Sequence, residues 1–403
     1  MSAPATSFSP TDLARAKDPY ASLAELRALG TVLRGSGSWL VLGHAEAMAL
    51  LRSSAARTGF IGQLYRDALP AGAARDELSH RINFLDPPEH TRVRRLVHKA
   101  FTPRRVNELR PFVEALCREL LAPLRSEACF DLIPRYAHPV PALVISELLG
   151  VPPGDRERLT ELSERVSLLL GLGGLDSTSK SDALAAAEEM HAYLRDLLEQ
   201  RRKRPADDLL SALLAVDDHE RLSEAELLSL AATLYSAGHR TTRDSFTNGL
   251  AALLPRRELV EQIRAGKLPA SAAVLEFLRF ETPTHYVARR LEQPLALGAL
   301  TIPAGEPIVV MLAAANRDPA AYTDADRFEP QRWLAEPAPP EPVSFAFGPH
   351  YCLGANLARM EAEVMLETLL DVMPGVALTG EPLRWRHSGL FRSLAALPLR
   401  PRG

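Results

Sequence analysis

The chain of 403 residues is poor in cysteine and nearly neutral overall. Three cysteines, Cys117, Cys129 and Cys352, are too few for a disulfide framework in so long a chain, so a reducing cytoplasm is the expected location. A formal net charge of −3 gives no electrostatic reason to expect a nucleic-acid partner. The remaining composition, 46% hydrophobic and 24% charged, is that of an ordinary globular protein.

Long apolar runs and cofactor-binding glycine patterns are also missing. No stretch is apolar over the length needed to cross a bilayer, and residues 1–20 have no apolar signal-peptide core. We therefore expect neither secretion nor a membrane anchor. No Gly-x-Gly-x-x-Gly pattern follows a predicted strand, so a flavin or nicotinamide site is not expected within this chain.

Hydrophobic periodicity predicts a mainly α protein with a minor β region. We expect a single domain over residues 1–403, with the β-rich part near 30–60 and 285–315. Short strands bounded by Gly or Pro are expected at 39–42, 295–302 and 308–312. The expected helices cover residues 18–29, 45–52, 88–100, 105–124, 139–149, 156–170, 181–202 and 223–254.

Two glycine- or proline-rich stretches interrupt this pattern. Residues 336–342 are too short for a domain linker and are interpreted as a rigid loop. The run from Gly171 to Gly174, between two helical segments, suits a mobile lid over a buried pocket.

Cys352 lies in the most informative segment, Phe345-Ala346-Phe347-Gly348-Pro349-His350-Tyr351-Cys352-Leu353-Gly354. An apolar stripe with helical spacing follows, so the cysteine precedes a helix whose N-terminus favours a thiolate. Gly348 and Gly354 allow the backbone to bend around the sulfur. A lone cysteine is more often a small buried residue, and we expect that role for Cys117 and Cys129.

This segment resembles the haem-binding loop of cytochromes P450, F-x-x-G-x-x-x-C-x-G, which is a highly specific pattern. The resemblance implies haem b, bound through Cys352 as the iron ligand, with Phe345, Gly348 and Gly354 shaping the loop. Thiolate ligation favours cleavage of the O–O bond, so dioxygen is the implied cosubstrate. The implied fold is the mainly helical cytochrome P450 architecture.

Three further segments match the same family in the expected order, so that the resemblance covers nearly the whole chain. Glu276-Phe277-Leu278-Arg279 is similar to the family's E-x-x-R pair, whose two charged groups share one helix face. In the family this pair is structural and locks the segment before the cysteine loop, here near Asp326 to Pro330. Taken alone, such a pair is a common solvated ion pair.

The second match begins at Asp86-Pro87-Pro88-Glu89-His90-Thr91-Arg92-Val93-Arg94-Arg95. His90 and Arg94 share a helix face, and the resemblance makes them partners of one haem propionate through charge-assisted hydrogen bonds. The alternative is a basic surface helix. Arg289 and His350 are the other implied propionate partners, with Arg290 as the competitor of Arg289.

The third match follows Ser223-Glu224-Ala225-Glu226, a capping box that starts a long helix. Ala237-Gly238-His239-Arg240-Thr241-Thr242 resembles the family's oxygen-activating signature A-G-x-[DE]-T-T. The resemblance gives Gly238 the role of making room for dioxygen. It gives Thr241, followed by Thr242, the role of helping to deliver protons.

Arg240 departs from the family, which usually has Asp or Glu at this position. A guanidinium does not titrate near neutrality and cannot relay protons as a carboxylate does. Either water and Thr241 deliver the protons, or the reaction demands less of the standard relay. The alternative roles are a structural pair with Asp244 at i,i+4 and an ion pair with a substrate carboxylate or phosphate.

A mostly apolar substrate pocket is implied by position relative to the family's segments, and each of its members is also compatible with plain core. The predicted lining comprises Phe60, Leu64, Leu169, Leu234, Ala237, His285, Val287 and Phe391.

The expected function is haem-thiolate monooxygenation, by hydroxylation or epoxidation, of a small molecule that is free or bound to a carrier protein, in secondary metabolism. Electrons would come from NAD(P)H through a ferredoxin and its reductase, or a flavodoxin. Arg95, Lys99, Arg104 and Arg105 form a basic patch to steer an acidic donor, or are ordinary solvated charges. A monomer is expected.

Two rival functions remain open in the sequence. A non-inserting oxidation, such as oxidative coupling or desaturation, is suggested by Arg240 alone. A non-catalytic haem protein, acting as a sensor or carrier, belongs to a different class, and the presence of Thr241 and Gly238 argues against it.

Overall fold

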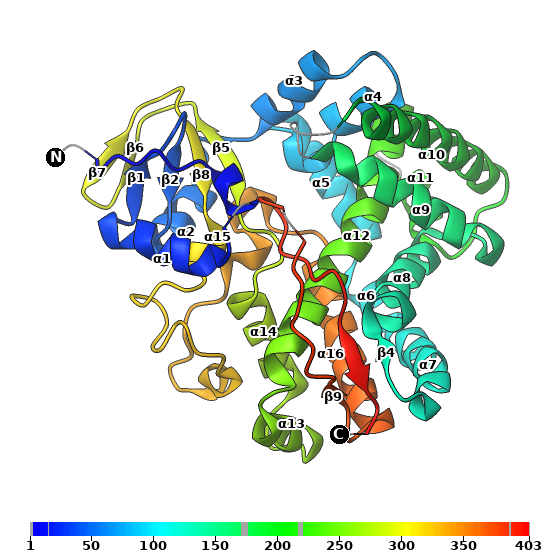
Figure 1. Ribbon diagram of the computed structural model, residues 1–403. Helices are drawn as coiled ribbons and strands as arrows, with labels where there is room; N and C mark the ends of the chain where they lie inside the picture. The colour runs from blue at the N-terminus through cyan, green and yellow to red at the C-terminus, as the bar shows by residue number, and fades with distance from the viewer. Residues whose placement is uncertain (1–2, 15, 171–175, 217–220, 387, 403) are drawn as a thin grey trace. The chain divides into compact units, whose positions relative to one another are not determined.

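The computed structural model describes residues 3–14, 16–170, 176–216, 221–386 and 388–402 (Figure 1). Helices dominate and the sheets are small, which confirms the expected fold class. The run from Gly171 to Gly174 lies outside the described residues, so the lid assigned to it stays a prediction. Among the helices described, none is both long and apolar enough to cross a membrane.

The chain divides into two compact units, each built from separated stretches of sequence. Unit 1 comprises Met1–Arg57, Val113–His138 and Thr241–Gly403, and unit 2 comprises Thr58–Phe112 and Pro139–Arg240. The chain enters each unit more than once, and the expectation of a single domain stays a prediction.

Unit 1 contains the β structure. Its largest sheet has the order β1-β2-β8-β5-β3, in which β2 and β8 pair in parallel and the other neighbours pair antiparallel. A second sheet has the order β4-β10-β9, and β6 and β7 form a hairpin whose turn includes Gly298 at φ +58°. The strands are β1 Val32–Arg34, β2 Trp39–Val41, β3 Ala56–Arg57, β4 Phe130–Asp131, β5 Val287–Leu291, β6 Leu295–Leu297, β7 Leu300–Ile302, β8 Pro307–Val310, β9 Ala377–Leu378 and β10 Pro398–Arg400.

Two apolar clusters flank the large sheet because successive strand residues face opposite sides. Val41, Ile308 and Val310 join one cluster, whereas Leu40 and Val309 join the other. Figure 1 shows α1, α2 and α15 beside these strands. The helices wholly within unit 1 are α1 Pro19–Leu29, α2 His44–Arg52, α13 Arg257–Arg264, α14 Ala270–Phe280, α15 Leu312–Ala315 and α16 Ala355–Val372.

Unit 2 is helical. The long helix α10 contacts α4, α9 and α11, and its buried face is built largely from alanine and leucine. Asp176 caps α10 by accepting hydrogen bonds from the backbone N–H groups of Thr178 and Ser179. The helices are α3 Gly59–Ala68, α4 Ala73–Ser79, α5 Glu89–Ala100, α6 Pro103–Glu108, α8 Pro139–Leu149, α9 Arg156–Ser167, α10 Ser177–Lys203 and α11 Leu209–Leu214.

Helices α7 (Arg110–Leu121) and α12 (Glu224–Leu253) contribute residues to both units. The predicted capping box starts α12: Ser223 N–H donates to Glu226 Oε2 at 2.8 Å, and Glu226 N–H donates to Ser223 Oγ at 3.2 Å.

Several expected elements differ from the structure in their bounds, two of them most clearly. The helix expected over 105–124 is interrupted at Leu109, because Pro111 lacks an N–H and is accommodated only in the first turn of a new helix, α7. The strand expected over 308–312 ends at Val310, and Leu312 begins the short helix α15.

Candidate functional site

The cysteine loop of unit 1 is folded back on itself before α16. Cys352 N–H donates a 3.0 Å hydrogen bond to the carbonyl of Phe345, which closes the loop. Gly354 occupies the N-cap position of α16, so Cys352 lies two residues before that cap, as the sequence predicts. The side chain of Cys352 is exposed, whereas that of Cys117 is buried. A thiol in this position is accessible to an iron centre.

Gly348 shapes the loop through two features that exclude a side chain. Its φ is +70°, and a Cβ built there would collide with the carbonyl oxygen of Leu51 at the end of α2. Gly354 has open space around its missing Cβ and an ordinary φ of −86°. Backbone packing therefore requires glycine at 348 but not at 354.

Strand β5 presents two arginines on opposite faces. Arg289 is buried, with 5% of its surface exposed, and donates to the carbonyl of Ala288 at 2.8 Å. Arg290 is exposed. Burial favours Arg289 over Arg290 as the inward-facing cation, and His350 lies half-buried in the short 3-10 turn Gly348–His350. An exposed thiol, a buried arginine and a half-buried imidazole are side chains of the kinds that a haem and its propionates require.

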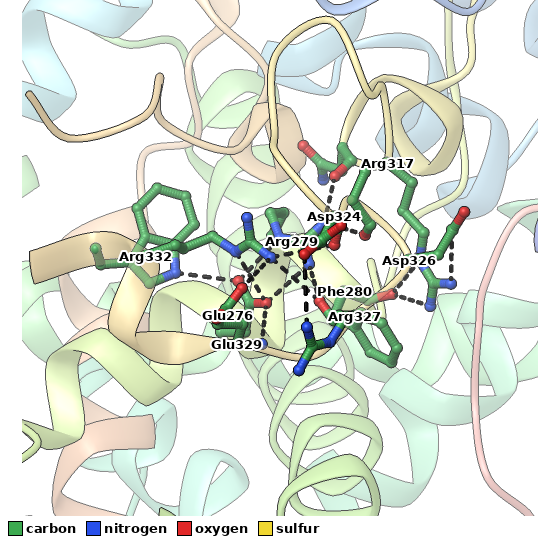
Figure 2. A network of polar contacts seen from close by, with 12 residues as sticks. Glu276, Arg279, Phe280, Arg317, Asp324, Asp326, Arg327, Glu329 and Arg332 are labelled. Carbon is green, nitrogen blue, oxygen red and sulfur yellow. Dashed lines mark hydrogen bonds and ion pairs between the residues drawn. The ribbon is translucent and has the colours of Figure 1, made fainter. Parts of the chain in front are cut away.

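Glu276 and Arg279 form a fully buried ion pair on α14, drawn in Figure 2, with Nη2 and Oε1 2.8 Å apart. Arg279 donates to the carbonyls of Asn316, Ala325 and Arg327 at 3.0, 2.7 and 2.8 Å. The pair therefore binds directly to the segment before the cysteine loop.

Glu276 completes this network from the other side. It accepts hydrogen bonds from Glu329 N–H at 2.7 Å, Trp333 Nε1 at 3.1 Å and Arg332 Nε at 3.3 Å. Because each charge has several partners, the pair can hold the chain at 316–333 without an uncompensated buried charge.

In the part of α12 that belongs to unit 1, Thr241 is half-buried and Thr242 is buried. Asp244 accepts from Arg243 Nε at 2.9 Å and from Ser393 Oγ at 2.6 Å. The alternative pairing of Asp244 with Arg240 joins residues of different units and stays a prediction.

Arg240 and Gly238 belong to unit 2. Arg240 Nη1 donates to Ser167 Oγ on α9 at 3.3 Å. A Cβ on Gly238 would lie 3.1 Å from Ile145 Cγ1, so this glycine permits close packing of α12 against α8. The role of Gly238 in making room for dioxygen stays a prediction, and packing is a second reason for its small size.

Helix α5 carries the other predicted propionate partners. His90 is buried and Arg94 is half-buried, one turn apart on the helix. The neighbouring His98 has a lowered pKa because of desolvation and the positive charge of Arg94.

The predicted pocket residues fall into two groups. In unit 1, His285 N–H donates to Leu390 O at 2.8 Å and Thr284 pairs with Phe391, so residues 285 and 391 are brought together, and Val287 begins β5 nearby. In unit 2, Tyr65 on α3 donates to Leu170 O at 3.0 Å, which places the helix of Phe60 and Leu64 beside the turn that holds Leu169.

Exposure separates these pocket residues further. Leu64 and Ala237 are exposed, Leu169 is buried, and Phe60 and Leu234 are half-buried.

The expectation that Cys129 is a core residue is wrong, because its side chain is exposed. Cys129 comes just before the two-residue strand β4, and no periodic apolar pattern fixes its orientation.

Glu361 on α16 was missed by the sequence reasoning. It is 1% exposed, and neither carboxylate oxygen has a hydrogen-bond partner among the described residues. Burial raises its pKa well above the ordinary value of 4.5. The signal was present: position 361 lies one turn from Leu357 and Met365, two buried residues of the apolar stripe.

Comparison with known proteins places these features in a family. The cytochrome P450 family model matches residues 268–372, which include the Glu276–Arg279 pair and the Cys352 loop. Cytochrome P450 monooxygenase PikC of Streptomyces venezuelae is 37% identical over 399 residues, covering 96% of this chain and 91% of PikC. Mycinamicin IV hydroxylase/epoxidase of Micromonospora griseorubida is 40% identical over 325 residues, covering 78% of each chain.

Solved structures agree with this assignment. The crystal structure of P450BioI in complex with hexadec-9Z-enoic acid ligated acyl carrier protein matches with a TM-score of 0.86 and 30% identity, covering 96% of this chain and 99% of P450BioI. Proteins of this family bind haem, use dioxygen and receive electrons from redox partners. The chain therefore belongs to the cytochrome P450 family and is an oxidoreductase of the monooxygenase class.

Proposed function

We propose that this enzyme hydroxylates or epoxidises a mostly apolar small molecule of secondary metabolism, using haem b. The loop that ends at Cys352 carries the proposal, because its closure leaves the thiol exposed before a helix N-terminus. The names of PikC and of the mycinamicin hydroxylase/epoxidase support the reaction class. When bound, haem supplies the oxygen chemistry.

The residues of this chain bind and orient that group. Cys352 provides the thiolate, and His90, Arg94, Arg289 and His350 provide cationic or N–H donors for the propionates. The Thr241 hydroxyl holds a proton within the central helix, where a carboxylate at 240 would ordinarily assist. Phe345, Gly348 and Gly354 shape the loop around the sulfur.

Arg240 supports a second reaction class, a non-inserting oxidation such as coupling or desaturation. Its guanidinium keeps its proton near neutrality, and it donates to Ser167 Oγ at 3.3 Å, a neutral partner. Position 240 therefore cannot act as the customary proton relay. A reaction with less need of that relay tolerates this substitution.

A ferredoxin or flavodoxin that draws electrons from NAD(P)H is the proposed donor. Arg95, Lys99 and Arg104 are exposed on α5 and α6 and can attract an acidic protein. Arg104 also pairs with Glu108 at 2.8 Å and Arg105 with Asp207 at 3.0 Å, which weakens the positive field. A monomer, a cytoplasmic location and a free or carrier-bound substrate stay predictions.

Labelled dioxygen tests the proposed reaction. Small apolar compounds are first screened for a shift of the Soret band of the haem-loaded enzyme. Each compound that binds is then incubated with a ferredoxin, its reductase, NADPH and labelled dioxygen. One labelled oxygen atom in the product supports hydroxylation or epoxidation. An oxidised product without label supports the non-inserting alternative, and no turnover with any donor supports a non-catalytic haem protein.

A further inference from the structure

A cavity of about 550 Å³ within unit 1 combines an apolar floor with a cationic rim. Leu13, Pro19 and Phe391 provide apolar lining, and Trp385 lines it as well. The volume is in the range of small-molecule sites.

The rim carries an excess of positive charge. Lys17, Arg384, Arg386 and Arg392 line the cavity, and no carboxylate is among the described residues that do so. Arg392 forms an ion pair with Glu281, which is not among the lining residues, with Nε and Oε2 3.0 Å apart, and its guanidinium lies 3.3 Å from the centre of the Trp385 ring. Arg384 and Arg386 are exposed, so their charges face the solvent edge.

His285 supplies a specific polar group at the inner side. Its ring is 1% exposed and lines the cavity, and Nδ1 lies 3.1 Å from the carbonyl oxygen of Gly389. A carbonyl only accepts hydrogen bonds, so Nδ1 carries the hydrogen and Nε2 of the neutral ring is an acceptor. Burial and the charge of Arg392 lower the pKa of His285 to about 4, which keeps the ring neutral at pH 7.

The second nitrogen of His285 has no hydrogen-bond partner among the described residues. A buried acceptor without a donor costs free energy, so a ligand that brings an O–H or N–H group restores that hydrogen bond. Because the His285 ring is neutral, the ligand needs no charged group at this point. The cavity therefore has two chemical requirements at once, an anion at the rim and a hydrogen-bond donor at His285.

We propose that this cavity binds an amphiphilic carboxylate whose hydroxyl or amide N–H donates to His285 Nε2 and whose acid group pairs with Arg384 and Arg386. The inference rests on the proposed function and deepens it by naming the substrate class, since His285 and Phe391 are two of the three predicted pocket residues in unit 1. The apolar body of the ligand would contact Leu13, Pro19 and Phe391.

Isothermal titration calorimetry of the haem-loaded enzyme tests the proposal with three probes of equal chain length: 12-hydroxydodecanoic acid, dodecanoic acid and dodecane-1,12-diol. We expect the hydroxy acid to bind at least about tenfold more tightly than dodecanoic acid, which lacks the hydroxyl, and than the diol, which lacks the carboxylate. A tenfold ratio corresponds to about 1.4 kcal/mol. Arg384→Gln/Arg386→Gln should remove the preference for the hydroxy acid over the diol. Arg264→Gln/Lys267→Gln, which removes two charges from unit 1 outside the cavity lining, should keep it.

Equal affinity of the wild type for the hydroxy acid and the diol would overturn the proposal. So would an unchanged preference for the hydroxy acid in the Arg384→Gln/Arg386→Gln variant. Binding without a shift of the Soret band would overturn the assignment of the carboxylate as substrate. The carbon-monoxide spectrum of the same samples reports the haem-thiolate centre separately, so its loss would count against the proposed function and not against the cavity.

Discussion

Gly348 lies against the carbonyl oxygen of Leu51, where a Cβ would collide with the backbone at the end of α2. The positive φ of +70° adds strain for any other residue, by roughly 1–2 kcal/mol. Gly348→Ala should therefore lower the free energy of unfolding by about 2–3 kcal/mol even without haem. Denaturant unfolding of the haem-free protein measures this change.

Gly354→Ala is the matched control in the same loop. Open space surrounds that position, so the haem-free variant should unfold like the wild type. If the backbone at Gly354 approaches the porphyrin, the same variant should bind haem about tenfold less tightly, a difference of 1.4 kcal/mol. Wild-type haem affinity in Gly354→Ala would contradict the role given to this glycine.

Glu276→Gln should destabilise the protein because it leaves the fully buried Arg279 guanidinium without its counter-charge. Breaking a buried pair typically costs about 3–5 kcal/mol. Asp324→Asn, in the exposed i,i+3 pair with Arg327, is the matched control and should change stability by less than about 1 kcal/mol. Similar losses in both variants would show that the buried network does not hold the segment before the cysteine.

Glu361 should make the stability of the protein fall as pH rises. Burial raises its folded-state pKa above 4.5, so the folded protein keeps a proton that the unfolded chain releases. Its contribution is therefore complete below about pH 4.5 and is lost, by about 1.4 kcal/mol per pH unit, up to the folded-state pKa. Glu361→Gln should remove this dependence, which unfolding measured from pH 5 to 8 would show. Parallel curves for variant and wild type would disprove it.

Much of the helical fold could be predicted from the sequence because long periodic segments specify helices strongly. Residues 139–149 match α8 at both ends, and the capping box marks the start of α12. Helices α3 and α4 were missed, since α3 begins at a glycine and α4 has only seven residues, too few for a clear period.

The Glu276–Arg279 ion pair could be predicted because a motif specifies it, and the structure contains it. The position of Cys352 before a helix could also be predicted, whereas its role as iron ligand stays a prediction. The burial of individual residues was harder to predict from the sequence. The exposure of Cys129 depends on tertiary packing around a two-residue strand, and the unpaired carboxylate of Glu361 depends on what surrounds α16. Neither the exposure of Cys129 nor the lack of a partner for the Glu361 carboxylate is encoded in a local pattern, although the helical spacing of Glu361 with Leu357 and Met365 indicates that position 361 is buried.

Arg240→Glu should restore a titratable acid at the position before Thr241. Haem content and the carbon-monoxide spectrum should stay unchanged, while product formed per NADPH consumed should change at least about twofold, since a carboxylate relays protons and a guanidinium does not. Arg240→Lys keeps the charge and should behave as the wild type. Unchanged yield per NADPH in Arg240→Glu would remove any special role for Arg240.

The carbon-monoxide difference spectrum of the reduced, purified protein reports whether a thiolate ligates the haem iron. Thiolate ligation by Cys352 predicts a Soret band at the long wavelength typical of that ligand, and Cys352→Ala should lose it. Cys129→Ala, which removes an exposed cysteine outside the loop, should retain the band. A histidine-type spectrum, or an unaltered band in Cys352→Ala, would contradict the assignment of Cys352 as the iron ligand.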